Sequence, residues 1–183
     1  IEPNTVFNKR PPLLPVEDVL ADIQDAGEAQ LADAGMQQYE VSAYSRPGRQ
    51  CRHNLNYWSF GDYLAIGAGA HGKVTGTDGQ ILRYAKTRRP QDYIEAVAGS
   101  CTTRSRILDR AEIIEEFMLF ALRLNRGFSE ARFESRTGLD LDALRPQLNQ
   151  LIDRGLLEHT GGMVRATHLG RRFLDSIIAE FLS

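Results

Sequence analysis

The sequence has few cysteines, no long apolar run and no excess of charge of one sign. Cys51 and Cys101 are the only cysteines and lie fifty positions apart, which excludes a disulfide framework and a local zinc knuckle. The apolar runs are far shorter than the roughly 20 residues of a membrane-spanning helix, and no charged-then-apolar signal segment opens the chain. With a net charge of −2, no global field favours nucleic acid or anionic lipid. We therefore expect a reduced, cytoplasmic protein.

The length of 183 residues allows one or two domains with a buried core. The chain has no initiator methionine and opens on Ile1-Glu2-Pro3-Asn4, which is typical of the end of a strand rather than of a natural start. We expect a segment of a longer protein, so the absence of a motif from this segment is weak grounds for excluding a function.

The first part of the chain is expected to mix helices and strands. Four prolines up to position 15 predict a loop, and apolar residues at helical spacing predict a helix over 17–34. Alternating residues over 39–44 predict a strand that ends at the turn Arg46-Pro47-Gly48. A helix followed by a strand is typical of a parallel α/β layer, and α/β is the fold class that we expect.

Further elements of this first part are expected after residue 60. They are a short apolar strand over 62–66, hairpin strands over 73–75 and 81–84, and a helix over 90–97. The stretch from Ser100 to Ser105 is polar and short, which predicts a link between two domains. We therefore expect a first domain over 1–103 and a second over 104–183.

The second domain is expected to have a winged-helix-like α+β layout. Asp109 can cap a long amphipathic helix through Leu124. The elements expected after it are helices over 128–133 and 141–154, a hairpin over 157–167 around Gly161-Gly162, and a last helix over 169–181.

The segment His53-Asn54-Leu55-Asn56-Tyr57-Trp58 holds the only tryptophan of the chain. As a structural element, its asparagines can tie down a turn while its two rings fill the edge of a core. As a functional element, its imidazole can ligate a haem iron and its rings can pack on a macrocycle. The arginines just upstream either bind propionate carboxylates or form a solvated basic turn: Arg46, Arg49 and Arg52. Both interpretations stay open on the residues alone.

A glycine-spaced loop, Gly67-Ala68-Gly69-Ala70-His71-Gly72, follows the strand expected at 62–66. Its glycines form a tight strand exit, or they let backbone amides approach a ligand closely. No Gly-Lys-Ser/Thr follows at the spacing of a Walker phosphate loop. His71 is either a hydrogen-bonding loop residue or a ligand, whereas His159 and His168 have no metal-ligand spacing and are expected at the surface.

Taken together, these segments resemble a known family. Gln50-Cys51-Arg52 followed by HNLNYW, and then GDYLAIGAGAHGK, resemble the HemW branch of the oxygen-independent coproporphyrinogen III oxidase-like proteins. These are radical S-adenosylmethionine (SAM) proteins, and members of this branch are described as haem chaperones. The opening IEPNTVF, the strand YEVSAYSRPG and the terminal module also resemble the family in order and spacing. The resemblance covers nearly the whole chain and implies the C-terminal portion of a full-length member.

The resemblance implies a fold and a ligand. The fold would be the C-terminal part of a radical SAM partial (β/α) barrel followed by the winged-helix-like domain. The family's [4Fe–4S] cluster, which binds S-adenosyl-L-methionine, needs a CxxxCxxC motif that this sequence lacks, so the segment alone is expected to be inactive as a radical enzyme. The resemblance places Gly67, Ala68 and Gly69 at the cofactor cavity and makes His53 the haem-iron ligand. It assigns haem contact to His53, Asn54, Leu55, Asn56, Tyr57 and Trp58.

Three functions are weighed on this basis. The first is a chaperone that binds haem and delivers it to an acceptor protein, with peripheral contact to membrane proteins. The second is a fragment of a coproporphyrinogen III oxidase, which decarboxylates propionates in porphyrin biosynthesis; the HNLNYW segment favours the first. The third is DNA binding by the winged module. Residues 104–183 hold twelve arginines and twelve acidic residues, so the basic excess typical of duplex binding is absent and no nucleic-acid partner is expected.

Overall fold

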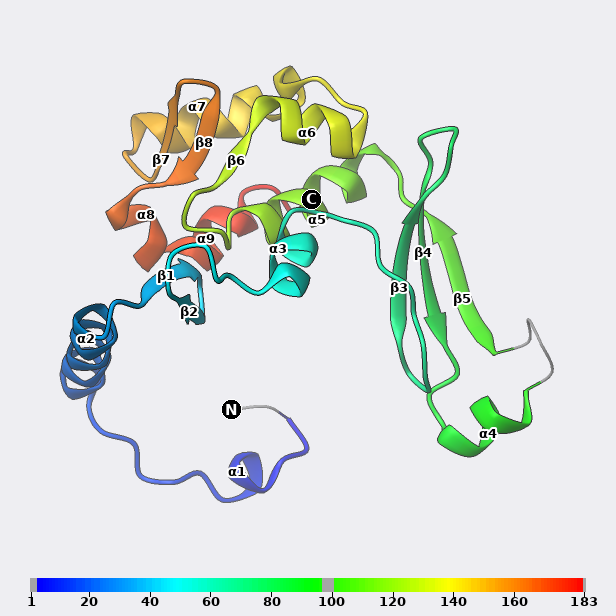
Figure 1. Ribbon diagram of the computed structural model, residues 1–183, viewed down its shortest axis with the longest axis horizontal. Coiled ribbons are helices and arrows are strands. Elements are labelled where there is room, and N and C mark those ends of the chain that lie inside the picture. The colour runs from blue at the N-terminus through cyan, green and yellow to red at the C-terminus, as the bar shows by residue number, and fades with distance from the viewer. Residues whose placement is uncertain (1–2, 97–100, 183) are drawn as a thin grey trace.

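The computed structural model describes residues 3–96 and 101–182 (Figure 1). The elements up to residue 107 are α1 (Val6–Lys9), α2 (Glu17–Asp33), β1 (Gln37–Glu40), β2 (Ala43–Ser45), α3 (Arg52–Trp58), β3 (His71–Thr75), β4 (Ile81–Lys86), α4 (Pro90–Glu95) and β5 (Thr102–Ile107). The elements after it are α5 (Arg110–Ala121), β6 (Phe128–Ser129), α6 (Glu130–Thr137), the 3-10 helix η1 (Leu141–Leu144), α7 (Arg145–Asp153), β7 (Leu157–Thr160), β8 (Met163–Ala166), α8 (His168–Arg172) and α9 (Leu174–Ala179).

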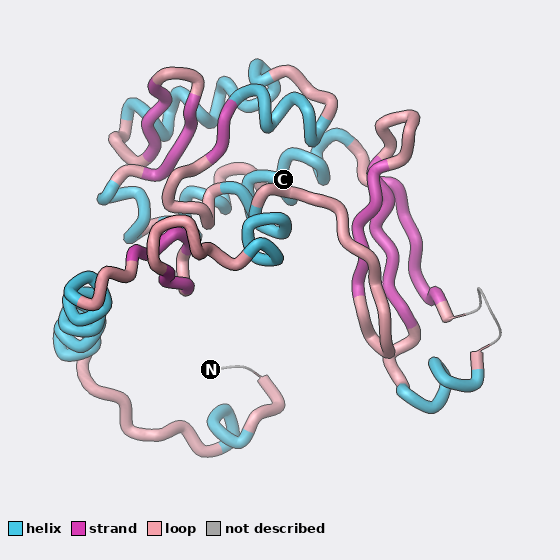
Figure 2. Tube along the Cα trace, in the orientation of Figure 1, coloured by secondary structure: helices cyan, strands magenta, loops and turns pink. Residues whose placement is uncertain are grey.

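The strands form three small sheets, which Figure 2 distinguishes from the helices: β1–β2, β3–β4–β5 and β6–β8–β7. Every strand pair in the described residues is antiparallel, so the parallel layer expected from residues 17–44 is not seen within them. The predicted single strand over 39–44 is a hairpin with a register shift. The buried carboxylate of Glu40 accepts a hydrogen bond from the Ser42 backbone N–H at 3.3 Å, which turns the chain back after β1.

The strand predicted over 62–66 is reduced to one isolated bridge between Tyr63 and Lys73. Two backbone N–H groups after this bridge donate to tyrosine side chains. The Tyr84 hydroxyl accepts from the Ala65 N–H at 2.9 Å, and the Tyr93 hydroxyl accepts from the Gly67 N–H at 3.1 Å. Because these N–H groups are satisfied by side chains, the segment needs no strand partner to bury them.

The polar stretch that predicts an interdomain link is a strand from residue 102 on. This strand, β5, pairs with β4 and completes the second sheet. Ser100 and Val97, the expected start of the link and end of the preceding helix, lie outside the described residues. The expected boundary at 103/104 therefore falls within a strand.

The second part of the chain follows the predicted order of elements more closely, although Phe128 and Ser129, expected to begin a helix, form strand β6, and helix α6 begins only after them. Helix α5 begins at a capping box, in which the Asp109 and Glu112 carboxylates accept from each other's backbone N–H groups. The hairpin β7–β8 turns at Gly161-Gly162, as predicted. The single last helix expected over 169–181 is instead divided into α8 and α9 at Phe173, whose φ of −119° is not helical.

One hydrophobic core crosses the expected domain boundary. The ring of Phe117 on α5 is fully buried and lies 5.7 Å from that of Phe60, 4.9 Å from that of Phe128 and 5.0 Å from that of Phe133. Helices α3 and α5 lie side by side, whereas the sheet β3–β4–β5 stands to one side of the helices (Figure 1). Helix α2 has no buried residue. None of the helices in the described parts of the chain has the length and apolarity that a membrane span requires.

Candidate functional site

Helix α3 carries the HNLNYW segment, so the turn that its asparagines can form is not what the structure has. The Leu55 N–H donates to the Cys51 carbonyl at 3.0 Å at the start of the helix, and Phe60, with a φ of 55°, follows its end. A Cβ on Gly61 would lie 2.2 Å from Asn56 Oδ1, so the return of the chain over α3 requires glycine there.

Residues four positions apart share a face of a helix, so His53 and Tyr57 lie on one face of α3, and Asn54 and Trp58 lie on the next. The His53 side chain is exposed. The rings of Tyr57 and Trp58 are half-buried, and their centroids lie 4.8 Å and 6.0 Å from that of Phe120 on α5. The two rings therefore anchor the helix, and the imidazole one turn before them stays accessible.

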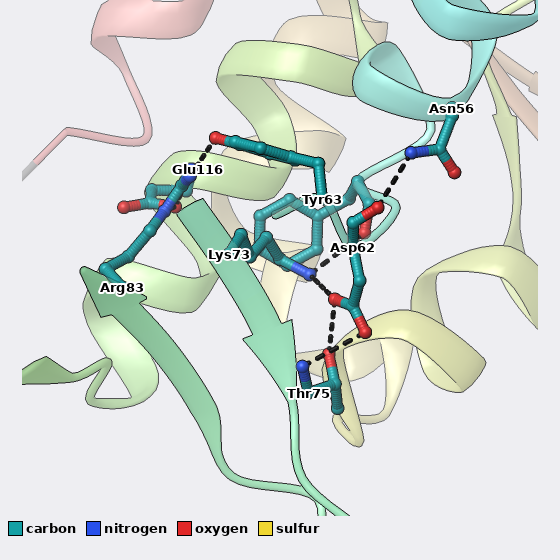
Figure 3. Close-up of polar contacts among 8 residues, drawn as sticks. Asn56, Asp62, Tyr63, Lys73, Thr75, Arg83 and Glu116 are labelled. Atoms are coloured by element: carbon teal, nitrogen blue, oxygen red, sulfur yellow. Dashed lines mark hydrogen bonds and ion pairs between the residues drawn. The ribbon is translucent and has the colours of Figure 1, made fainter. Parts of the chain in front are cut away.

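The two asparagine side chains tie α3 to neighbouring segments. Asn54 Nδ2 donates to the Tyr39 hydroxyl at 3.2 Å, which joins α3 to β1. Asn56 Nδ2 donates to the Asp62 carbonyl at 2.9 Å, a contact drawn in Figure 3. Both amides therefore hold the helix in place through their Nδ2 donors.

An ion pair between a buried lysine and a partly exposed aspartate lies beneath this contact (Figure 3). Lys73 Nζ, on a side chain that is 1% exposed, donates to Asp62 Oδ1 at 2.9 Å and to the Phe60 carbonyl at 3.1 Å. The Asp62 carboxylate also accepts from the Thr75 N–H and hydroxyl at 3.0 and 2.9 Å. Burial lowers the pKa of Lys73 although Asp62 opposes the shift. Burial would raise the pKa of Asp62, but the hydrogen bonds from Lys73 and Thr75 outweigh it and the pKa is lowered.

A second polar chain runs from α3 to α5 through the sheet. Arg83 on β4 donates to the Tyr63 hydroxyl and pairs with Glu116 on α5 at 2.5 Å (Figure 3). Burial, together with a hydrogen bond and charge interaction with Tyr63, raises the pKa of Tyr57 to about 12. Tyr57 is therefore a neutral phenol at physiological pH.

A cleft of about 910 Å³ lies beside this chain, between the sheet and helix α5. Tyr57 and Tyr63 form part of its wall, and strands β3, β4 and β5 supply most of the rest. Its lining residues are Tyr57, Tyr63, His71, Arg83, Tyr84, Ala85, Thr103, Arg104, Ser105, Arg106 and Glu116. Of the residues singled out from the sequence for haem contact, only Tyr57 lines it.

The other predicted site residues lie outside this cleft. Arg46 and Arg49 are exposed in a turn closed by the hydrogen bond from the Arg49 N–H to the Arg46 carbonyl at 3.0 Å, and Arg52 is exposed at the first position of α3. The glycines at 67 and 69 have φ values of 98° and 71°. Their amides donate to the Tyr93 hydroxyl and to the Thr87 carbonyl, so both are occupied within the protein, and Ala68 between them is exposed.

Most of the cleft residues that the sequence interpretation missed come from the strands β3, β4 and β5. His71 was considered only as part of the glycine loop, and Arg104 and Arg106 fell within or beyond the expected link. The signal that could have found them is the alternation Thr-Thr-Arg-Ser-Arg over 102–106, which is typical of a strand with arginines on one face.

Known proteins match this chain over different lengths. Residues 108–173 match the model of the HemN C-terminal domain. The whole chain is 45% identical to the haem chaperone HemW of Escherichia coli (strain K12), covering 48% of that protein, and 41% identical to that of Haemophilus influenzae, covering 47% of it. It is 32% identical to the haem chaperone HemW of Bacillus subtilis, again covering 48%. The chain thus spans about half the length of the curated relatives it matches.

The fold also has a solved counterpart. The structure of coproporphyrinogen III oxidase (HemN) from Escherichia coli, described as a radical SAM enzyme, superposes with a TM-score of 0.64 at 19% identity. It covers 92% of this chain, and the chain covers 42% of that structure. At this level of identity the likeness shows a shared mixed α/β fold.

Proposed function

We propose, from the premise that the chain belongs to the HemW-type branch of the coproporphyrinogen III oxidase-like proteins, that it is the haem-binding part of a haem chaperone. The haem is its cargo, to be passed to an acceptor protein, and a contact with membrane proteins at that step is part of the same proposal. The observation that carries it is the accessible imidazole of His53 on the face of α3 that continues into the half-buried ring of Tyr57.

In this proposal the residues of α3 and of the turn before it have different roles in binding haem. A neutral His53 imidazole donates a lone pair to the haem iron. Tyr57 and Trp58 offer ring surface to the macrocycle, although both also pack on Phe120. Contacts from Asn54, Leu55 and Asn56 remain part of the proposal. The exposed guanidinium groups upstream are proposed to reach the propionates: Arg46, Arg49 and Arg52.

A haem titration tests this proposal. Added haem is expected to give a Soret band with the wild-type chain, and His53→Ala is expected to lose it or to shift it to that of unligated haem. His168→Ala is the matched control, because His168 is also an exposed histidine at the start of a short helix, and its band should equal that of the wild type. A Soret band that is the same in all three proteins would contradict iron ligation by His53.

A coproporphyrinogen III oxidase fragment is the second candidate, since its substrate is also a tetrapyrrole with propionates. The HemN likeness supports it only through the shared fold, whereas the curated relatives at 45% and 41% identity are named haem chaperones. Addition of coproporphyrinogen III distinguishes the two: a chaperone is expected to prefer the iron complex, because only the iron can be ligated by His53. The near-neutral charge of residues 104–183 gives no support to nucleic-acid binding.

The iron–sulfur cluster of the family does not fit the residues of this chain. A [4Fe–4S] cluster on three cysteines needs one more cysteine than the two present, and no group of three or more potential ligands gathers in the described residues. A contact of the loop Gly67, Ala68 and Gly69 with S-adenosyl-L-methionine remains a proposal that its occupied amides do not favour.

The assignment of the chain to two domains is also a proposal: residues 1–103 would be the last part of a partial (β/α) barrel, and residues 104–183 a winged-helix-like domain. The apolar residues of α2 support the barrel part, because Val19, Leu20 and Ile23 share a face and are exposed. Exposed apolar patches of this kind mark surfaces that other structure covers. In relatives about twice as long, the remaining part of the barrel would provide that cover.

The chain alone is therefore expected to self-associate through α2. Sedimentation velocity should show a sedimentation coefficient that rises with concentration, and a Leu20→Glu/Ile23→Glu variant should remove the rise. Ala29→Glu adds a charge to the opposite face of the same helix and should leave the rise unchanged. A wild-type chain that is monomeric at every concentration would contradict the proposed cover over α2.

A further inference from the structure

The register of β3, β4 and β5 gathers basic residues on one face of the sheet. Side chains alternate between the two faces of a strand, so residues paired across the strands share a face. Two such rows are His71–Ala85–Arg104, whose members all line the cleft, and Lys73–Arg83–Arg106, of which Arg83 and Arg106 line it. The end residues of each row are two strand spacings apart, which is roughly 10 Å.

Carboxylates of the protein already neutralise most of these cations. Lys73 pairs with Asp62, Arg83 with Glu116, and Arg106 with Glu112. Arg104 differs: it is exposed, it lines the cleft, and it forms no ion pair with any of the residues in 3–96 and 101–182. Arg104 therefore places an uncompensated positive charge at the cleft.

The opposite part of the cleft is aromatic. The rings of Tyr57 and Tyr63 lie 5.0 Å apart with an interplanar angle of 40°, and both line the cleft. His53 lies one helical turn before Tyr57, about 6 Å along the axis of α3. A cleft with ring surface on one side and a free guanidinium on another suits a flat ligand with an anionic edge.

We propose that this cleft binds a propionate edge of the tetrapyrrole, with Arg104 as the partner of a carboxylate and Tyr57 and Tyr63 as the surface beneath the macrocycle. This inference rests on the proposed haem function. The inference adds Arg104 to the proposed haem site. Arg104 is far from the HNLNYW segment in sequence, and the pairing of β5 with β4 places it at the cleft. The volume of about 910 Å³ accommodates a ligand of this size.

Haem and its dimethyl ester test the role of Arg104, because esterification removes the negative charges and keeps the ring and iron. The wild-type chain is expected to bind the ester about tenfold more weakly than haem, the effect of losing a charge-assisted hydrogen bond. Arg104→Gln should bind haem about tenfold more weakly and lose the preference for haem over its ester. Arg104→Lys, which keeps the charge, should restore part of the preference. Arg171→Gln, a change at another exposed arginine, should keep all of it.

The outcomes separate this inference from the proposed function. If haem binding depends on His53 but Arg104→Gln leaves the preference unchanged, the function stands and the assignment of the cleft is wrong. If the preference is lost only when Arg46, Arg49 and Arg52 are all replaced by glutamine, the upstream turn binds the carboxylates and the assignment is equally wrong. If the wild-type chain binds neither haem nor the ester, both proposals fail.

Discussion

Replacing Phe117 by alanine is expected to lower the free energy of unfolding by about 4 kcal/mol, the cost of a large cavity at a fully buried aromatic position. The ring is fully buried and meets Phe60, Phe128 and Phe133 edge-on. Phe60 precedes the expected boundary at 103/104, and the other two follow it. The loss is therefore expected to destabilise both parts of the chain together.

Urea unfolding followed by two signals checks this expectation. Fluorescence of Trp58, the only tryptophan, reports on α3, and far-ultraviolet circular dichroism reports on all helices. Both midpoints should fall together in Phe117→Ala. Phe173→Ala is the matched control, because Phe173 is 51% exposed and its loss should cost under about 1 kcal/mol. A circular dichroism midpoint that falls while the fluorescence midpoint stays unchanged would indicate two independently folding domains.

Local sequence signals were sufficient for much of the second part of the chain. The cap at Asp109 and the double glycine at 161–162 act within a few residues, and the structure has both the helix and the hairpin that they predict. Helix α2 was predicted for the same reason, from apolar spacing within one segment. These elements depend little on the rest of the fold.

The elements that the sequence did not predict depend on distant contacts. The HNLNYW segment has aromatic and asparagine residues of low helix propensity, yet it forms α3, because Tyr57 and Trp58 pack on Phe120. Residues 62–66 form no strand, because distant tyrosine hydroxyls satisfy the amides of Ala65 and Gly67.

The candidate site also has one part that local sequence predicts and one part that depends on distant contacts. His53 was identified from its sequence neighbours, and the structure places it on an accessible face of α3. The cleft could not be predicted, because it depends on the register between β3, β4 and β5, and β5 lay in the stretch expected to be a link. A wrong assignment of one strand was therefore enough to miss Arg104.

Removal of the Asp62 carboxylate is the second change that is expected to lower the free energy of unfolding by a large amount. Asp62→Ala leaves Lys73, which is 1% exposed, without its ion-pair partner, and leaving a buried charge unpaired should cost about 3 kcal/mol. The Asp62 side chain is itself 38% exposed, so Lys73→Met should cost much less, because it removes the buried charge and leaves a carboxylate that water can solvate.

The pH dependence of stability gives an independent check of this ion pair. The pKa of Asp62 is lower in the folded protein than its ordinary value of 3.8, so the unfolded chain binds the proton more readily than the folded protein does. The stability from this group is present above the ordinary carboxyl range and is lost as the pH falls through the folded pKa, from about pH 5 downwards. Asp62→Asn cannot titrate, so the difference in stability between it and the wild type should shrink towards acid pH.

A double variant decides whether the pair or the single residues account for these losses. If the cost of Asp62→Ala comes from the stranded charge of Lys73, then Asp62→Ala/Lys73→Met should be more stable than Asp62→Ala alone, although it carries one more substitution. Urea unfolding of the four proteins at neutral pH measures the coupling. Additive losses would mean that Asp62 stabilises the fold through its hydrogen bonds with Thr75. The position of α3 depends on the answer, because the Asp62 carbonyl accepts the hydrogen bond from Asn56, next to Tyr57 in the proposed haem site.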